Sequence, residues 1–217
     1  MNAFTPTPRS RLRRKPERAH YDRGAIHAVL DAHFICHVGY VVDGQPYVTP
    51  TSYWRDSDRL YWHGSSASRM LRHLRDGAPA CVTVTHCDGL VLARSGFHSS
   101  INYRSVMAFG TARALEDEAS KLAAMKAFVE RLTPGRWDEL RPVTKQELEA
   151  TTVIGMDIDE AVAKVRSGGP VDDEDDYGLG VWAGVVPLGV AVGEPEPDRR
   201  LKPGVPTPDY LKDWRLG

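Results

Sequence analysis

Two polar segments carry residue types that could bind a ligand. Residues 61–69, Tyr-Trp-His-Gly-Ser-Ser-Ala-Ser-Arg, lead through small residues from an expected strand into an expected helix. Free amide donors at a helix start, the helix dipole, the hydroxyls of Ser65, Ser66 and Ser68 and the charge of Arg69 together suit a phosphate monoester. A helix cap followed by a surface arginine has the same sequence, and the residues alone leave both interpretations open.

The second polar segment covers residues 98–105, His-Ser-Ser-Ile-Asn-Tyr-Arg-Ser, at the start of a long expected strand. A strand with one buried face shows apolar residues at alternate positions. Polar side chains in their place predict a wall that faces a ligand, and the alternative is an exposed strand edge.

Other chemistry finds little support. The chain has no G-x-G-x-x-G, P-loop, G-x-S-x-G or H-E-x-x-H motif, which argues against hydrolases and kinases. His33 and His37 lie where the pattern turns into a strand, so we prefer a structural or surface role for them. Cys81 fits a small core residue, and the acidic run 172–176 lacks EF-hand spacing. We therefore predict no metal site.

Composition limits the class of protein. The 217 residues are 41% hydrophobic and 26% charged, which suits one globular domain with appendages. With 28 Lys and Arg against 29 Asp and Glu, no global field attracts nucleic acid or anionic membranes. Three cysteines without a C-x-x-C pair, no long apolar run and no signal peptide pattern predict a reduced, cytoplasmic protein without a membrane span.

The expected elements are mainly antiparallel strands with a few covering helices. Helix starts are marked by Asp22 and Thr144, a hairpin turn by Asp43-Gly44 and a strand bend by Gly110. We expect helices at 23–32 and 116–132, a helix that ends at Gly77 and a short helix after Thr144. Strands are expected at 34–42, 46–54, 60–63, 80–85, 90–93, 102–115, 152–158 and 181–192. Asp88-Gly89 predicts a second hairpin turn, and the type of 161–165 is undecided. Such a pattern describes a closed barrel.

The two ends differ from this middle part. Residues 1–18 form a basic, proline-containing arm without aromatics for stacking bases, so nucleic acid binding is a weak alternative to packing on a partner subunit or remaining solvated. Residues 193–217 form a proline-rich tail. The barrel domain is assigned to residues 19–192.

Taken together, the motifs resemble the pyridoxamine 5′-phosphate oxidase-like, FMN-binding split-barrel superfamily, near the nitroimidazole reductase-type proteins. The resemblance spans residues 14–187. It rests on Lys15-Pro16-Glu17-Arg18-Ala19 with Tyr21-Asp22, on Val48-Thr49-Pro50 to Tyr53, on Leu60-Tyr61-Trp62-His63-Gly64-Ser65 with Ser68-Arg69, on Asn102-Tyr103-Arg104-Ser105-Val106 with Phe109-Gly110, and on residues 181–187.

The resemblance implies a mainly β, antiparallel, Greek-key-like split barrel that forms a homodimer with FMN at the subunit interface. By match to the family, the flavin ring, ribityl chain and phosphate are contacted by Thr49, Pro50, Thr51, His63, Gly64, Ser65, Ser68 and Arg69, and a strand that crosses the interface contributes Arg104, Ser105 and Val106. The family's C-terminal Trp and Arg signature is absent after Pro187, so pyridoxine phosphate is not the expected substrate. Trp182 is expected to be a buried core residue rather than a flavin-stacking one.

The leading hypothesis is an FMN-dependent oxidoreductase that acts on an unidentified small molecule. His63 is the candidate catalytic residue, because a histidine beside the flavin can donate a proton near neutral pH. The alternatives are a flavin store or sensor without turnover, and a split barrel that uses haem or a deazaflavin.

Overall fold

The structure is a computed structural model, and it describes residues 2–215. The strands are β1 (Ala19–His20), β2 (Ile35–Val42), β3 (Gln45–Asp56), β4 (Arg59–Ser65), β5 (Asp76–Leu92), β6 (Ser100–Ala114), β7 (Thr151–Asp157), β8 (Glu160–Arg166) and β9 (Gly184–Pro187). The α-helices are α1 (Arg23–Asp31), α2 (Arg69–Leu74), α3 (Glu118–Leu132) and α4 (Lys145–Ala150). Short 3-10 helices are η1 (Pro16–Arg18), η2 (Trp137–Glu139), η3 (Glu174–Gly178) and η4 (Asp209–Leu211).

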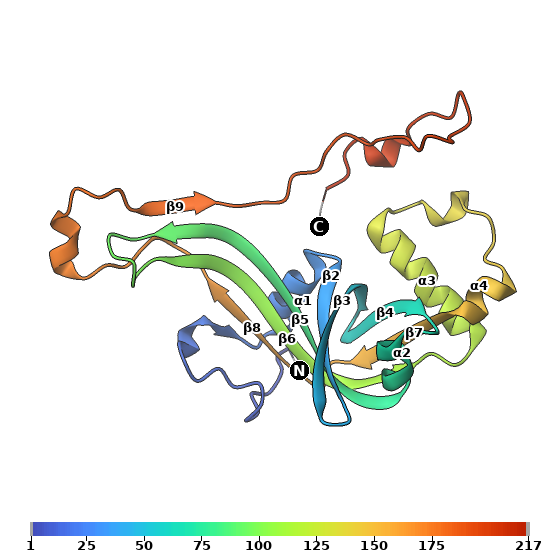
Figure 1. Cartoon of the computed structure of the whole chain (residues 1–217), viewed down its shortest axis with the longest axis horizontal. Coiled ribbons are helices and arrows are strands. Elements are labelled where there is room, and N and C mark those ends of the chain that lie inside the picture. The colour runs from blue at the N-terminus through green and yellow to red at the C-terminus, as the bar shows by residue number, and fades with distance from the viewer. Residues whose placement is uncertain (1, 216–217) are drawn as a thin grey trace.

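All strand pairs are antiparallel, and the sheet closes on itself. Its order is β1-β8-β6-β7-β4-β3-β2-β5-β9, and an additional β5–β6 pairing joins β2, β3, β4, β7, β6 and β5 into a ring. Closure pairs the strand edges that would otherwise face solvent. The mainly β split-barrel class is therefore confirmed, and Figure 1 shows the long β5–β6 pair projecting from one side while α3 and α4 lie at the other.

Gly110 marks the point where β6 exchanges partners. Residues 103–109 pair with β8, whereas 112–114 pair with β7. A Cβ atom on Gly110 would stand 2.1 Å from the Asp157 carbonyl oxygen, so only glycine allows this close approach of two backbones. The bend expected at this residue opens the barrel between β7 and β8.

The core fills the barrel and the surface beneath α1 and α2. Asp22 caps α1 through its side chain, and Ile26, Val29 and Leu30 bury one face of that helix against β5 and β6. On the opposite side of β4, a second apolar cluster joins Trp54 and Val153 to α3. The helix α3 buries Ala124 against this cluster, while Leu122 remains 40% exposed.

Two expectations about local structure are wrong. The dipeptide Asp88-Gly89 does not form a turn, because β5 continues to Leu92 and the register shifts there by one residue against β6. A Cβ atom on Gly89 would lie 3.0 Å from the Val186 carbonyl oxygen, so this glycine admits β9 rather than a turn. Trp182 is 65% exposed rather than buried, because the last strand, β9, begins only at Gly184.

Both ends of the chain contact the barrel domain. Phe4 joins the core, and Arg9 forms an ion pair of 2.5 Å with Glu160 on β8. The tail runs from β9 across the molecule to α3 (Figure 1), where the Trp214 Nε1–H donates to the Leu132 carbonyl oxygen at 2.6 Å. Residues 3–10 and 209–214 are thus held by the fold.

Candidate functional site

The segment expected to bind phosphate lies where β4 ends and α2 begins. The Ser65 Oγ accepts from the Ala67 N–H at 3.2 Å, which shapes a tight turn before the helix. Ser68 is the N-cap residue of α2, but its side chain makes no capping hydrogen bond. The Ser68 hydroxyl therefore remains available to a ligand.

Arg69 supplies a positive charge at this turn. Its guanidinium lies 4.3 Å from the centre of the Tyr47 ring, and the side chain has no acidic partner among residues 2–215. Tyr47 stacks on Tyr40, whose hydroxyl lies 3.2 Å from the Thr49 Oγ1. Arg69 and Thr49, both predicted from sequence, thus belong to one polar and aromatic neighbourhood.

The three predicted residues of β3 point to two faces of the sheet. Side chains alternate along a strand, so Thr49 and Thr51 share the inner face with Tyr53, while Pro50 lies on the outer face. Tyr53 is 2% exposed inside the barrel. Pro50 is therefore the one of the three that lies on the outer face, beside His37, its direct partner on β2.

His63 lies on the outer face of β4, beneath α3. Its ring centre is 4.7 Å from that of Phe128 in an edge-on contact and 5.9 Å from that of Trp54. Its Nδ1 is buried, and no residue in 2–215 forms a hydrogen bond with it. Burial lowers the pKa of His63, so the neutral imidazole is favoured.

Gly64 occupies the inner face of the same strand. A Cβ atom at this position would meet Leu71 of α2 at 3.1 Å. The glycine therefore allows α2 to pack closely against β4, and this packing holds the start of α2 next to the 65–68 turn.

Arg104 lies in a different region, at the C-terminal end of α1. Its guanidinium makes two hydrogen bonds with Asp88, of 2.9 and 2.8 Å, and these lower the pKa of the Asp88 carboxyl group. Asp88 is the extra residue of the bulge in β5, and bulges re-aim a side chain in this manner. A cavity of about 430 Å³ there is lined by Arg104, His86 and His33 among others.

Two histidines meet in this cavity, although they are 53 positions apart in the sequence. The ring centres of His33 and His86 are 5.7 Å apart, and burial together with the charge of His86 lowers the pKa of His33. The His86 Nε2 lies 2.9 Å from the Val29 carbonyl oxygen, which only accepts hydrogen bonds, so Nε2 carries a hydrogen and donates it. The sequence spacing pairs His33 only with His37, because spacing along the chain cannot reveal a partner on another strand.

Ser105 and Val106 complete the predicted set. The Ser105 Oγ donates to the Lys164 carbonyl oxygen at 3.4 Å, and Val106 is fully buried in the core. In the six-strand ring, β6 lies opposite β3, with β5 and β2 between them on one side and β7 and β4 on the other. The chain thus brings Thr49, Ser65, Ser68 and Arg69 to one side and leaves Arg104 to Val106 on another.

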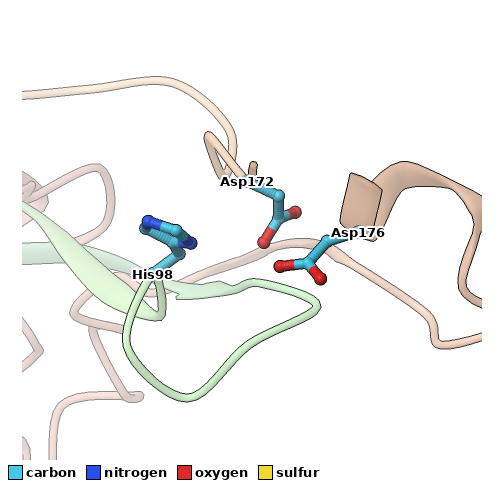
Figure 2. A group of neighbouring side chains, drawn as sticks. All are labelled: His98, Asp172 and Asp176. Atoms are coloured by element: carbon cyan, nitrogen blue, oxygen red, sulfur yellow. The ribbon is translucent and has the colours of Figure 1, made fainter. Parts of the chain in front are cut away.

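A cluster of metal-ligating side chains lies at the far end of the β5–β6 pair. His98, Asp172 and Asp176 have ligand atoms within 4.8 Å of one another, and Figure 2 shows both carboxylates turned toward the same space. Asp172 already accepts hydrogen bonds from the Arg94 backbone N–H at 2.9 Å and from its guanidinium at 3.0 Å. These hydrogen bonds tie Arg94, and with it the segment 93–99, to Asp172. The positive charge of the Arg94 guanidinium disfavours binding of a metal cation beside Asp172.

With this geometry established, comparison with known proteins identifies the family. A family model described as pyridoxamine 5′-phosphate oxidase matches residues 22–165. The chain belongs to this family. The match covers the barrel from α1 to β8, which includes all predicted site residues. A search of curated proteins finds no match.

Two solved structures resemble the chain over nearly its whole length. The flavocytochrome Anf3 from Azotobacter vinelandii is 46% identical, with a TM-score of 0.93 over 99% of this chain and 100% of that one. A FAD and haem binding protein from Mycobacterium smegmatis is 38% identical, with a TM-score of 0.85 over 90% of this chain and 96% of that one.

A third comparison supports the fold alone. A putative 5-nitroimidazole antibiotic resistance protein from Bacteroides thetaiotaomicron is 22% identical, with a TM-score of 0.56 over 68% of this chain and 86% of that one. The family match confirms the expected superfamily, and this third structure shows that its fold is shared. Within residues 2–215, no helix has the length and apolar character needed to span a membrane.

Proposed function

We propose that this protein is a redox protein of the flavocytochrome type, which binds a flavin and a haem and transfers electrons to or from a small molecule. The observation that carries the proposal is the 46% identity to a flavocytochrome over 99% of the chain. The 38% identity to a FAD and haem binding protein favours FAD over the FMN expected from the family resemblance. A flavin supplies hydride or electron transfer when bound, and the protein supplies binding, orientation and exclusion of water.

The polar turn at the end of β4 fits a flavin phosphate. Arg69 carries a charge that no acidic residue in 2–215 neutralises, and the Ser68 hydroxyl is not used to cap α2. A charged donor beside free hydroxyl groups binds phosphate by charge-assisted hydrogen bonds. We therefore assign the flavin phosphate to Ser65, Ser68 and Arg69.

Two imidazoles have the chemistry to hold haem iron. The His63 Nδ1 is buried without a protein partner, in an aromatic surrounding of Trp54 and Phe128. His86 donates its Nε2–H to the Val29 carbonyl oxygen, so Nδ1 is the nitrogen of this ring that would hold iron. A neutral ring with one free nitrogen is the form that ligates iron, and a hydrogen bond at the other nitrogen orients it.

A homodimer would bring the separated site residues together. In one protomer, Arg69 and the Arg104 strand belong to different regions, whereas the family resemblance has both contacting one flavin. The second protomer's Arg104 strand could reach the flavin held at Arg69. The outer sheet face also exposes apolar side chains that a partner would cover, including Ile35, Val41, Val48 and Met107.

His63 has two candidate roles in this proposal. Beside the flavin, it is the proton donor to a reduced substrate expected from the sequence, and its lowered pKa would then move the activity toward acidic pH. As a haem ligand, it would be neutral at all working pH values. Replacement of His63 by alanine separates the roles, because a lost ligand shifts the Soret band while a lost proton donor leaves it in place.

The decisive experiment is an absorption spectrum of the full-length protein produced with adequate haem supply. We expect flavin bands and a Soret band together, and chromatography of the released flavin to give FAD. A protein that takes up neither flavin nor haem in titrations would refute the proposal. Bound flavin that is not reoxidised by quinone or nitroaromatic acceptors would favour the second candidate, a flavin store or sensor without turnover.

A further inference from the structure

An apolar groove lies between α3 and α4, on the outer face of the sheet. It has a volume of about 400 Å³, within the range of roughly 300–1,000 Å³ that is typical of small-molecule sites. Its walls come from Met125, Trp137, Leu140, Val143 and Leu148, with the Arg141 and Glu147 pair among the lining residues. Leu140 and Val143 are 42% and 37% exposed, so the groove is open to solvent.

The walls of the groove are fixed by hydrogen bonds within the chain. Glu130 accepts from the backbone N–H of Gly135 at 2.7 Å and from that of Trp137 at 2.9 Å, which holds the indole-bearing segment against α3. Lys121 Nζ donates to the Leu148 carbonyl oxygen at 2.7 Å and joins α3 to α4. The groove therefore exists before any ligand binds, which reduces the ordering cost of binding.

The opposite rim of the groove is equally well held. Glu147 and Thr144 form a capping box at the start of α4, and Arg141 makes hydrogen bonds of 2.9 and 2.5 Å with Glu147. These contacts lower the pKa of Glu147 to about 2, so the pair stays charged at neutral pH. The groove thus combines an apolar floor with a charged rim.

The groove is directly adjacent to the turn assigned to the flavin phosphate. Thr151, which lines the groove, is the direct β7 partner of Ser65 on β4, and the Ser66 N–H donates to the Ala150 carbonyl oxygen at 2.9 Å. Directly opposite residues of an antiparallel pair point to the same face of the sheet. Ser65, Thr151 and His63 therefore share the face that α3 and α4 cover.

We propose that this groove holds the adenosine half of FAD, with the adenine packed against the Trp137 indole. This inference rests on the proposed function. A dinucleotide continues beyond the first phosphate, and this groove both borders the 65–69 turn, through Thr151, and has an aromatic, apolar lining that includes Trp137 and Leu140. Stacking on an aromatic face suits adenine, because every base has a π-face.

The proposal gives a physical reason for a preference for FAD over FMN. FMN ends at the phosphate held by Ser65, Ser68 and Arg69, so it leaves the groove empty. FAD gains the additional contact with Trp137 and covers the exposed Leu140 and Val143 side chains. The discrimination therefore depends on residues between α3 and α4, separate from those that hold the flavin phosphate.

The test compares flavin affinities of the full-length protein after removal of its flavin. Trp137→Ala should weaken FAD binding by about tenfold or more, on the scale of lost base stacking, and leave FMN binding unchanged. Val143→Trp, at the exposed mouth of the groove, should also weaken FAD binding and leave FMN binding unchanged, because the larger side chain fills the groove without disturbing the fold. Tyr177→Ala removes a 47% exposed aromatic from another 3-10 helix and serves as the matched control.

Fluorescence of Trp137 gives a second readout that does not depend on activity. FAD should quench the part of the emission that Trp137→Phe removes, and FMN should not. Equal effects of both variants on FAD and FMN, or unchanged FAD binding in both, would overturn the groove assignment while flavin binding itself stands. A protein that binds neither FAD nor FMN would overturn the proposed function together with this inference.

Discussion

Replacement of Arg69 by alanine tests the phosphate assignment most directly. Arg69 is exposed, has no acidic partner within residues 2–215 and contacts the Tyr47 ring at 4.3 Å. Its removal should therefore affect the ligand far more than the fold. A cation over an exposed aromatic ring contributes about 0.5–1 kcal/mol, so the free energy of unfolding should fall by no more than that amount.

The effect on ligand binding should be larger and specific to the phosphate. A hydrogen bond to a charged group contributes about 1.5–3 kcal/mol, which corresponds to about a 10- to 150-fold weaker affinity for FMN or FAD. Riboflavin lacks the phosphate, so its affinity should stay near that of the unaltered protein. The gap between the two ligands measures the interaction of Arg69 with phosphate.

The assay is a flavin fluorescence titration of the flavin-free protein with FMN, FAD and riboflavin. Arg72→Ala is the matched control, because Arg72 is an exposed arginine one turn further along the same helix. We expect wild-type affinities in this control, and a smaller difference between FMN and riboflavin at high salt. Equal losses for FMN and riboflavin in Arg69→Ala would show that Arg69 acts through packing, and the phosphate assignment would fail.

Further predictions concern the site, the pH response, the assembly and the barrel. His63→Ala should keep flavin bound and slow its reoxidation by quinones by roughly 10²-fold in stopped-flow measurements, and an unchanged rate would remove His63 from proton transfer. Burial lowers the pKa of His63, so below the ordinary histidine pKa the unfolded chain binds more protons than the folded one. The free energy of unfolding in urea should therefore be highest above that pKa and fall as the pH drops below it. His63→Gln should reduce this dependence of the unfolding free energy on pH. Light scattering should give the mass of a dimer, and the midpoint of thermal unfolding should rise with protein concentration. A monomer that retains its flavin would contradict this prediction. Gly110→Ala should lower the free energy of unfolding by about 1–3 kcal/mol, because its Cβ atom would clash with the Asp157 carbonyl oxygen. Gly189→Ala, which has open space around it, should leave the free energy of unfolding in chemical denaturation unchanged.

Local signals in the sequence determined the features that depend on near neighbours. Asp43 and Gly44 both have positive φ angles, 50° and 79°, as the hairpin turn between β2 and β3 requires. Asp22 and Thr144 cap their helices as expected, because a capping bond joins residues three positions apart. The strand, small-residue turn and helix around Ser65 to Arg69 were also visible in the sequence.

Contacts between distant segments could be decided only by the tertiary structure. Asp88-Gly89 has the composition of a turn, but pairing with β6 and β9 on either side holds it in one continuous strand. The sequence predicts a buried Trp182, but this side chain is 65% exposed because it precedes β9, which begins at Gly184. Nothing near Arg104 in sequence indicates its ion pair with Asp88, which depends on a bulge in the neighbouring strand.

The environment of His63 illustrates the same limit. Its place at the end of β4 followed from the sequence, whereas its burial under Phe128 and its unpartnered Nδ1 depend on how α3 packs across the sheet. The groove beside Trp137 likewise requires α3 and α4 to meet at one face. Sequence patterns report the period and caps of each element, but burial and hydrogen bonding of a side chain depend on elements that the fold brings from elsewhere in the chain.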